Sequence, residues 1–260
     1  MLVLCYGIPR SGSTLAFEMV CEILRSAGYE QAFVRNDRIG AQNPKGKSGR
    51  NYLDRISKEA IAELVTTIGP SRKIAVKTHG AFTEDLFPWL EELQQKRDLQ
   101  VIASYRDPRD VCLSLLEAGE KSRSKPVPGS FRRVDSFQTA AQNVKHRIVS
   151  FRRWASLHGT LRLNYEIVAF QPDDAIAEIE RVLGVTSDHE QVMHRAFDEA
   201  DTLKNKAKSQ RHLEDMDALP RKELTEIFRN FIRKACEEDD QQWYEKFRRK
   251  ILENRDTSAT

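Results

Sequence analysis

The sequence has little of what marks a specialised class of protein. It contains only four cysteines and no C-x-x-C pair, which argues against a disulfide-stabilised scaffold and against a zinc site. Its formal net charge is only +3, from 42 basic and 39 acidic residues, so it lacks the concentrated basic stripe of a nucleic-acid-binding protein. No apolar run approaches the length needed to span a bilayer. We therefore expect an ordinary globular protein with reduced thiols, no nucleic-acid partner and no membrane span.

The first ten residues, MLVLCYGIPR, also lack the basic segment and the long apolar run of a secretion signal. We therefore expect a cytoplasmic protein, whereas no feature of the sequence indicates its oligomeric state. The chain of 260 residues is long enough for one sizeable domain, and no linker-like change of composition divides it. The sequence thus predicts a single domain over residues 1–260.

Short apolar runs alternate with amphipathic segments along the first 185 residues. The apolar runs predict buried strands at 2–6, 73–77, 99–105 and 160–165. Helical spacing predicts helices over 15–27, 57–68, 83–96, 108–118, 137–157 and 171–184. Strands that alternate with helices predict an α/β fold, with a mostly parallel β-sheet flanked by helices. The predicted α/β core covers 1–185, and the charged remainder, 186–260, is predicted to be a helical C-terminal part.

The stretch YGIPRSGST, residues 6–14, is nearly a Walker A phosphate loop, G-x-x-x-x-G-K-[ST]. Gly7, Gly12 and Thr14 are in place, but Ser13 occupies the lysine position and Arg10 precedes it. The predicted strand before the stretch and the predicted helix after it provide the context that a phosphate loop needs, although a plain turn between strand and helix would share it. Unpaired N–H groups at a helix start bind anions, and Gly12 lets an anion approach the backbone closely.

The missing lysine makes the loop poorly suited to the β- and γ-phosphates of a nucleoside triphosphate. The hydroxyls of Ser11, Ser13 and Thr14 add donors for an anion. Arg10 offers a planar and permanently charged fork for a phosphate or sulfate oxygen pair.

Two further stretches follow predicted strands at their carboxyl ends, where ligands bind in open α/β sheets. VKTHG (76–80) contains Lys77 and His79, and an imidazole there can act as a general base; an ordinary loop histidine is the alternative. SYRDPRDVCLS (104–114) contains Arg106, followed by an aspartate N-cap and a proline that open a helix carrying Ser114. The alternative for this stretch is that its arginines simply pair with the neighbouring aspartates.

Together, PRSGST, KTH and YRDPRDVCLS resemble motifs of the sulfotransferase family that uses 3′-phosphoadenosine 5′-phosphosulfate (PAPS). They resemble its 5′-phosphosulfate loop, its base-carrying segment and its 3′-phosphate motif, respectively. RLNYEIVAFQPDDAIAEIERVLGV (162–185) resembles the strand-to-helix segment of the same family. The resemblance therefore runs from residue 7 to about residue 185, in the correct order. It implies a P-loop-NTPase-like fold and release of the product adenosine 3′,5′-bisphosphate (PAP).

The resemblance also implies a role for each matching residue. The cofactor-binding residues would be Ser11, Gly12, Ser13 and Thr14 at the 5′-phosphate, Arg106 and Ser114 at the 3′-phosphate, and Tyr165 against the adenine. The catalytic residues would be His79, which takes the proton of the acceptor, with Arg10 and Lys77. Arg10 stands where cytosolic members usually have lysine, beside the bridging oxygen, and it stabilises charge because arginine stays protonated. No metal is needed, and the acceptor is a small-molecule or carrier-bound hydroxyl compound.

Two rival functions are weaker. A small-molecule kinase or NTPase of the P-loop class would need Mg²⁺ and a lysine at position 13. A catalytically inactive nucleotide-binding module would be favoured if His79 or Arg106 were missing, and both are present. A zinc hydrolase is excluded because the two histidines of HEQVMH (189–194) are five residues apart and do not share a helix face.

Two basic stretches complete the predictions. The glycine-rich basic motif that cytosolic members carry near the C-terminus is not recognisable in this sequence. The basic stretch 203–211 either substitutes for it or is a solvated helix face, and we favour the solvated face. The Pro/Gly/Ser-rich stretch 120–135, with Phe131 and Phe137 nearby, is predicted to be a loop that covers the acceptor.

Overall fold

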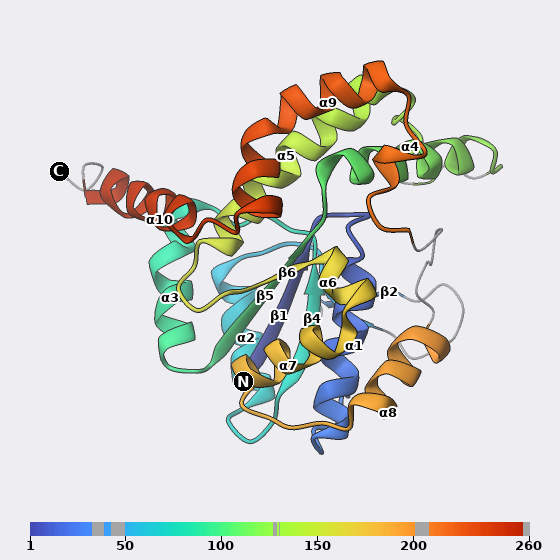
Figure 1. The fold of residues 1–260 in the computed structure, drawn as a ribbon. Helices are drawn as coiled ribbons and strands as arrows, with labels where there is room; N and C mark the ends of the chain where they lie inside the picture. Colours follow the sequence, from blue (N-terminus) through green and yellow to red (C-terminus); the bar gives the residue numbers. More distant parts are fainter. Residues whose placement is uncertain (33–38, 43–49, 127–128, 130, 201–207, 257–260) are drawn as a thin grey trace.

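A six-stranded β-sheet in the order β2-β3-β4-β1-β5-β6 forms the centre of the molecule (Figure 1). The structure is a computed structural model, and it describes residues 1–32, 39–42, 50–126, 129, 131–200 and 208–256. The strands are β1 (Leu2–Gly7), β2 (Ile39–Gln42), β3 (Arg50–Leu53), β4 (Ile74–Thr78), β5 (Leu99–Tyr105) and β6 (Leu161–Asn164). β2 is antiparallel to β3, and the other pairs are parallel. The predicted mostly parallel sheet is confirmed, but β2 and β3 are too short and polar to be recognised from the sequence.

Helices cover both faces of the sheet. They are α1 (Ser13–Ser26), α2 (Lys58–Ile68), α3 (Phe87–Gln95), α4 (Pro108–Arg123), α5 (Phe137–Ala155), α6 (Tyr165–Phe170), α7 (Pro172–Leu183), α8 (His189–Met193), α9 (Ala218–Phe231) and α10 (Gln241–Asp256). Shorter helical turns are η1 (Glu84–Leu86), η2 (His194–Glu199), η3 (Arg211–Leu213) and η4 (Ile232–Glu237). Among the described residues, no helix combines the length and the apolar character needed to cross a membrane.

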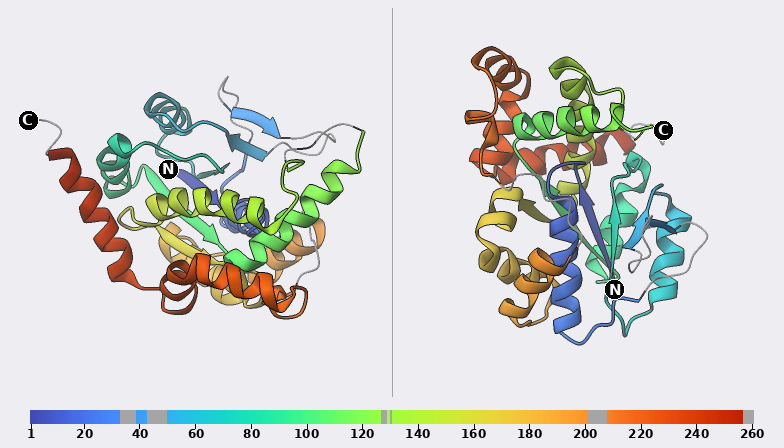
Figure 2. Two further views of the ribbon diagram at one scale, coloured as in Figure 1. Left: turned by 90° about the horizontal axis from the view of Figure 1, so that it is seen from above. Right: turned by 90° about the vertical axis from the view of Figure 1, so that its right-hand side faces the viewer.

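Alternate residues of β1 face two different hydrophobic cores, as the period of a strand requires. Leu2, Leu4 and Tyr6 belong to a core that includes residues of α2, α3, α4, α5, α9 and α10. Val3 and Cys5 belong to a second core, formed with α1, α7 and α8. The right-hand view of Figure 2 shows α1, α7 and α8 on one side of the sheet and α2 on the other. Burial on both faces explains why β1, β4 and β5 are continuous apolar runs in the sequence.

A third group of helices, α4, α5 and α9, lies across the carboxyl ends of the strands (Figure 1). Two buried tyrosines attach it to the sheet: Tyr6 donates a hydrogen bond to the Arg147 carbonyl of α5 at 3.2 Å, and Tyr105 donates to the Ala235 carbonyl at 2.8 Å. The C-terminal helices α9 and α10 thus share a core with the sheet. That the chain is a single domain stays a prediction.

The basic stretch 120–135 differs from the predicted loop at its beginning. α4 continues to Arg123, with Lys121 and Arg123 in its last turn, where positive charge is favourable. Gly119 does not end the helix; a Cβ there would lie 2.0 Å from the Val134 carbonyl oxygen, so this glycine allows the following segment to pack closely. Phe131 and Phe137 pack against the main core. Residues 127, 128 and 130 lie outside the described residues.

Candidate functional site

The predicted site residues meet because β1 lies between β4 and β5. Tyr6 of β1 is aligned with Thr78 of β4, and Gly7 of β1 with Ser104 of β5. The three parallel strands therefore end at nearly the same height, and the segments after them leave the sheet side by side. VKTHG (76–80) follows the strand next to β1, and both Lys77 and His79 contact the phosphate loop.

The phosphate loop, residues 7–14, is a tight turn that leads directly into α1. Arg10 and Gly12 both have positive φ, 72° and 80°, and Ser13 begins the helix. The Ser11 hydroxyl donates to the Ile8 carbonyl at 2.7 Å, so it stabilises the loop itself. Among the described residues, the N–H groups of Gly12, Ser13 and Thr14 have no hydrogen-bond acceptor. Unpaired N–H groups at a helix start are groups to which an anion can bind.

Tyr165, at the start of α6, packs directly on this loop. A Cβ on Gly12 would lie 2.4 Å from Cδ2 of the tyrosine, so only glycine allows the ring to come this close. The Arg106 guanidinium carbon also lies close to the ring, 4.0 Å from its centroid. The sequence-based expectation placed Tyr165 against an adenine. The structure shows its ring close to both the phosphate loop and Arg106.

Lys77 supplies an ammonium group to the phosphate loop from the neighbouring strand. Its Nζ donates to the Thr14 hydroxyl at 2.7 Å, and the residue is only 5% exposed. Lys77 of β4 therefore supplies an ammonium group to a loop in which Ser13 stands where a Walker A sequence has its lysine. The ammonium lies beside the first turn of α1, where an anion would bind.

His79 is held in one tautomer by the loop backbone. Its Nδ1 lies 2.6 Å from the Gly7 carbonyl oxygen, which can only accept, so Nδ1 carries the proton and Nε2 keeps its lone pair. The pKa of His79 is lowered from 6.5 to about 4, mainly by burial and then by Lys77, against the opposing effect of the bond to Gly7. The imidazole is therefore neutral at pH 7 and able to accept a proton at Nε2.

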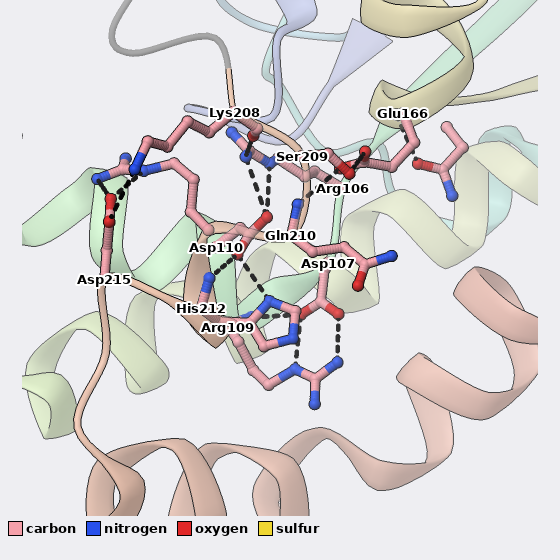
Figure 3. Close-up of polar contacts among 12 residues, drawn as sticks. Arg106, Asp107, Arg109, Asp110, Glu166, Lys208, Ser209, Gln210, His212 and Asp215 are labelled. Carbon is pink, nitrogen blue, oxygen red and sulfur yellow. Dashed lines mark hydrogen bonds and ion pairs between the residues drawn. The ribbon is translucent and has the colours of Figure 1, made fainter.

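Arg106 belongs to a buried ion network at the start of α4 (Figure 3). Asp110, which is 0% exposed, accepts from Arg106 Nε at 3.2 Å and from the backbone N–H and Nδ1 of His212, both at 2.8 Å. Arg106 Nη2 also donates to the Lys208 carbonyl at 2.9 Å. Burial alone would raise the pKa of Asp110, but the hydrogen bond from His212 and the charge of Arg106 outweigh it, and the net shift is downward.

The helix start after Arg106 forms as predicted. Asp107 caps α4 by accepting from the Arg109 N–H at 2.8 Å, and Pro108 occupies the first turn. The Asp107 carboxylate also pairs with the Arg109 guanidinium at 2.6 Å. Arg106 pairs with Asp110, and Arg109 pairs with Asp107. The alternative that the arginines of this stretch pair with its aspartates is therefore correct in the free protein. Among the described residues, no acceptor contacts Nη1 of Arg106, which leaves this group for a ligand.

Arg10 lies on the Arg106 side of the loop. Its Nε donates to the Ser114 hydroxyl of α4 at 3.1 Å. The pKa of Arg10 is lowered, mainly by burial, while Glu117 opposes the shift and Arg106 and Arg211 add to it. The structure thus brings Arg10, Arg106 and Ser114 into one cationic cluster, separate from the pair of Lys77 and His79.

The interpretation of 203–211 as a solvated helix face is wrong for Arg211. This residue is 2% exposed, and its guanidinium pairs with Glu117 at 2.7 Å and Asp215 at 3.0 Å. Residues 201–207 lie outside the described residues. The segment 208–212 packs against the start of α4, as Figure 3 shows. No local signal identifies this contact, because it depends on Asp110 and Glu117, about a hundred residues earlier in the chain.

The two histidines of the rejected zinc motif contact different carboxylates. His189 lies 3.1 Å from Asp173 and 3.3 Å from Glu180, while His194 contacts Asp198 at 3.2 Å. Across the described ranges, no group of three or more histidine, cysteine, aspartate or glutamate side chains is placed to hold a metal ion.

Comparison with known proteins agrees with this arrangement. Residues 2–257 match the family model described as sulfotransferase domain. No curated protein matches the sequence. Among solved structures, retinol dehydratase in complex with androsterone and inactive cofactor PAP is 18% identical, with a TM-score of 0.50 over 89% of this chain and 80% of that one. Mouse sulfotransferase SULT7A1 complexed with PAP is 14% identical, with a TM-score of 0.55 over 95% of this chain and 88% of that one.

The environment of His79 predicts its titration. In the free protein, the imidazole resonance identified by its loss in His79→Gln is expected to titrate by NMR near pH 4 rather than near 6.5. Because the unfolded chain takes up this proton first as the pH falls, the native state loses stability between pH 6.5 and about 4, and His79→Gln removes that loss. A midpoint at or above 6.5 would contradict the assignment of a buried neutral base.

Proposed function

The chain belongs to the sulfotransferase domain family, and on this premise we propose that it transfers a sulfuryl group from PAPS to a hydroxyl acceptor. The observation that carries the proposal is the placement of Lys77 and His79 beside the anion-binding start of α1. The two solved structures with the same fold were both crystallised with PAP, which supports PAPS as the donor.

The donor would bind along the carboxyl ends of β4, β1 and β5. The amides of Gly12, Ser13 and Thr14 would hold the 5′-phosphate, and Lys77 would contact the sulfuryl oxygens. Arg106 through Nη1, together with Ser114, would hold the 3′-phosphate. Arg10 lies against Ser114, so we place its charge between the two phosphates. Tyr165 contacts both the loop and Arg106, so its ring would fix the distance between them. The same ring would lie beneath the nucleoside.

The reaction needs one proton transfer and one displacement. The acceptor oxygen attacks sulfur in line, its proton passes to Nε2 of His79, and the bond between sulfur and the 5′-phosphate oxygen breaks to release PAP. Negative charge that develops on the sulfuryl and leaving oxygens is stabilised by Lys77 and the loop amides, groups fixed before the reaction. Bound donor anions also raise the pKa of His79 toward neutrality, so the base strengthens when it is needed.

The structure disfavours a magnesium-dependent kinase or NTPase. In that class the hydroxyl at the position of Thr14 binds Mg²⁺, whereas here it accepts from the Lys77 ammonium. An inactive nucleotide-binding module would have no use for a neutral histidine with a free Nε2. The acceptor is proposed to be a small-molecule or carrier-bound hydroxyl compound.

Calorimetry tests the donor class. PAP should bind well without metal, and Mg²⁺-ATP should bind at least about tenfold more weakly. Ser114→Ala removes a hydrogen bond to a charged phosphate, so it should weaken the binding of PAP by roughly tenfold or more. Its affinity for adenosine 5′-phosphate, which has no 3′-phosphate, should stay nearly unchanged. Tight binding of Mg²⁺-ATP without affinity for PAP would refute the proposal.

Transfer from labelled PAPS tests the catalytic roles. His79→Gln should lower kcat by roughly 10²–10⁴-fold because the general base is lost. Lys77→Met should lower kcat by roughly 10²–10³-fold because a preorganised charge is lost. PAP lacks the sulfuryl group, so His79→Gln should bind it with nearly unchanged affinity, which also shows that this variant folds. Lys77→Met loses a charge beside the 5′-phosphate as well, so it should bind PAP more weakly. Unchanged turnover in His79→Gln would remove this residue from the base role.

A further inference from the structure

Arg147 of α5 is fixed beside the proposed base. Its Nη1 donates to the His79 carbonyl at 3.1 Å, and its own carbonyl accepts from the buried Tyr6 hydroxyl at 3.2 Å. The first contact holds the guanidinium against the segment that carries the imidazole. The second contact fixes this turn of α5 over β1. Arg147 is partly exposed, so its remaining N–H groups are accessible to a ligand.

Tyr52 of β3 approaches His79 from another side. The two rings meet edge to face, with centroids 5.9 Å apart. The pKa of Tyr52 is raised by burial and then by Asp54, while Arg147 acts in the opposite direction, which places the phenol within the field of this guanidinium. An imidazole, a phenol and a guanidinium from three different segments therefore converge at the carboxyl end of β4, which β1 separates from the Arg106 cluster at the end of β5.

The charge of Arg147 has no partner within the described part of the chain. No carboxylate there pairs with it, whereas Arg106, Arg109 and Arg211 each pair with an aspartate or glutamate. The charge of Arg147 also opposes protonation of His79, although burial and Lys77 contribute more. A cation at this position therefore weakens the base unless an anion neutralises it.

We propose that Arg147 binds an anionic group of the acceptor, a carboxylate or a phosphate ester, next to the hydroxyl that His79 deprotonates. This inference rests on the proposed function and names the acceptor class, hydroxyl compounds that carry a negative charge. Nε and Nη2 of Arg147 offer the planar fork that suits such oxyanions. Acceptor binding would neutralise Arg147 and thereby strengthen the base, so that only an acceptor of the correct charge activates His79 fully.

The experiment uses ligand titrations of the protein saturated with PAP, with the His79 imidazole followed by NMR. The ligands are 4-hydroxybenzoate, 4-hydroxyphenyl phosphate and the neutral methyl 4-hydroxybenzoate. At least one anion is expected to bind about tenfold or more tightly than the ester, as one charge-assisted contact allows, and to raise the pKa of His79. The anion that does so identifies the acceptor group.

Arg147→Gln should abolish this preference without changing the affinity for PAP. The matched control is Arg153→Gln, because Arg153 lies on the same helix but pairs with Glu84 and donates to the Phe82 carbonyl. The control should keep the preference. The inference is overturned if the ester binds as tightly as both anions, if none of the three binds, or if the preference survives in Arg147→Gln. Repeating the titration without PAP separates this result from a failure of the donor assignment, which would appear as absent PAP binding.

Discussion

The parallel pairing of β1 with β4 and β5 is the constraint on which the site depends. It aligns Gly7 with the ends of both neighbours, so that the phosphate loop, Lys77 with His79, and Arg106 leave the sheet at one height. Without it, Lys77 could not reach the hydroxyl of Thr14, 63 residues away in the chain, and supply an ammonium group to the loop.

The electrostatic balance of the site is strongly positive. Lys77, Arg10 and Arg147 are set around the ends of the strands, and Asp110 is the buried carboxylate that holds Arg106 in position. Such a site is costly when empty, because like charges oppose one another in a partly desolvated space. A polyanionic donor and an anionic acceptor would together neutralise it. The low pKa of His79 is a consequence of this balance, since burial and the neighbouring cations both disfavour the imidazolium ion.

The sequence predicted the parts of the site that short-range patterns encode. The buried strands at β1, β4 and β5 are apolar runs, and the helix start after Arg106 has its own aspartate cap and proline, so both were recognisable. Contacts between distant segments were not: Tyr165 packs on Gly12, Arg10 turns toward Ser114, and Arg211 is buried against Glu117. Arg147 is one of several basic residues on a regular amphipathic helix, and only its distance to His79 distinguishes it.

A crystal structure of the protein with PAP tests the central claim most directly. The account predicts the 5′-phosphate on the amides of Gly12, Ser13 and Thr14, within hydrogen-bonding distance of Lys77, and the 3′-phosphate on Arg106 and Ser114. His79 Nε2 should then face the open side of the 5′-phosphate, where sulfur would lie. A nucleotide bound in the opposite direction, or away from the carboxyl ends of β4, β1 and β5, would contradict the account.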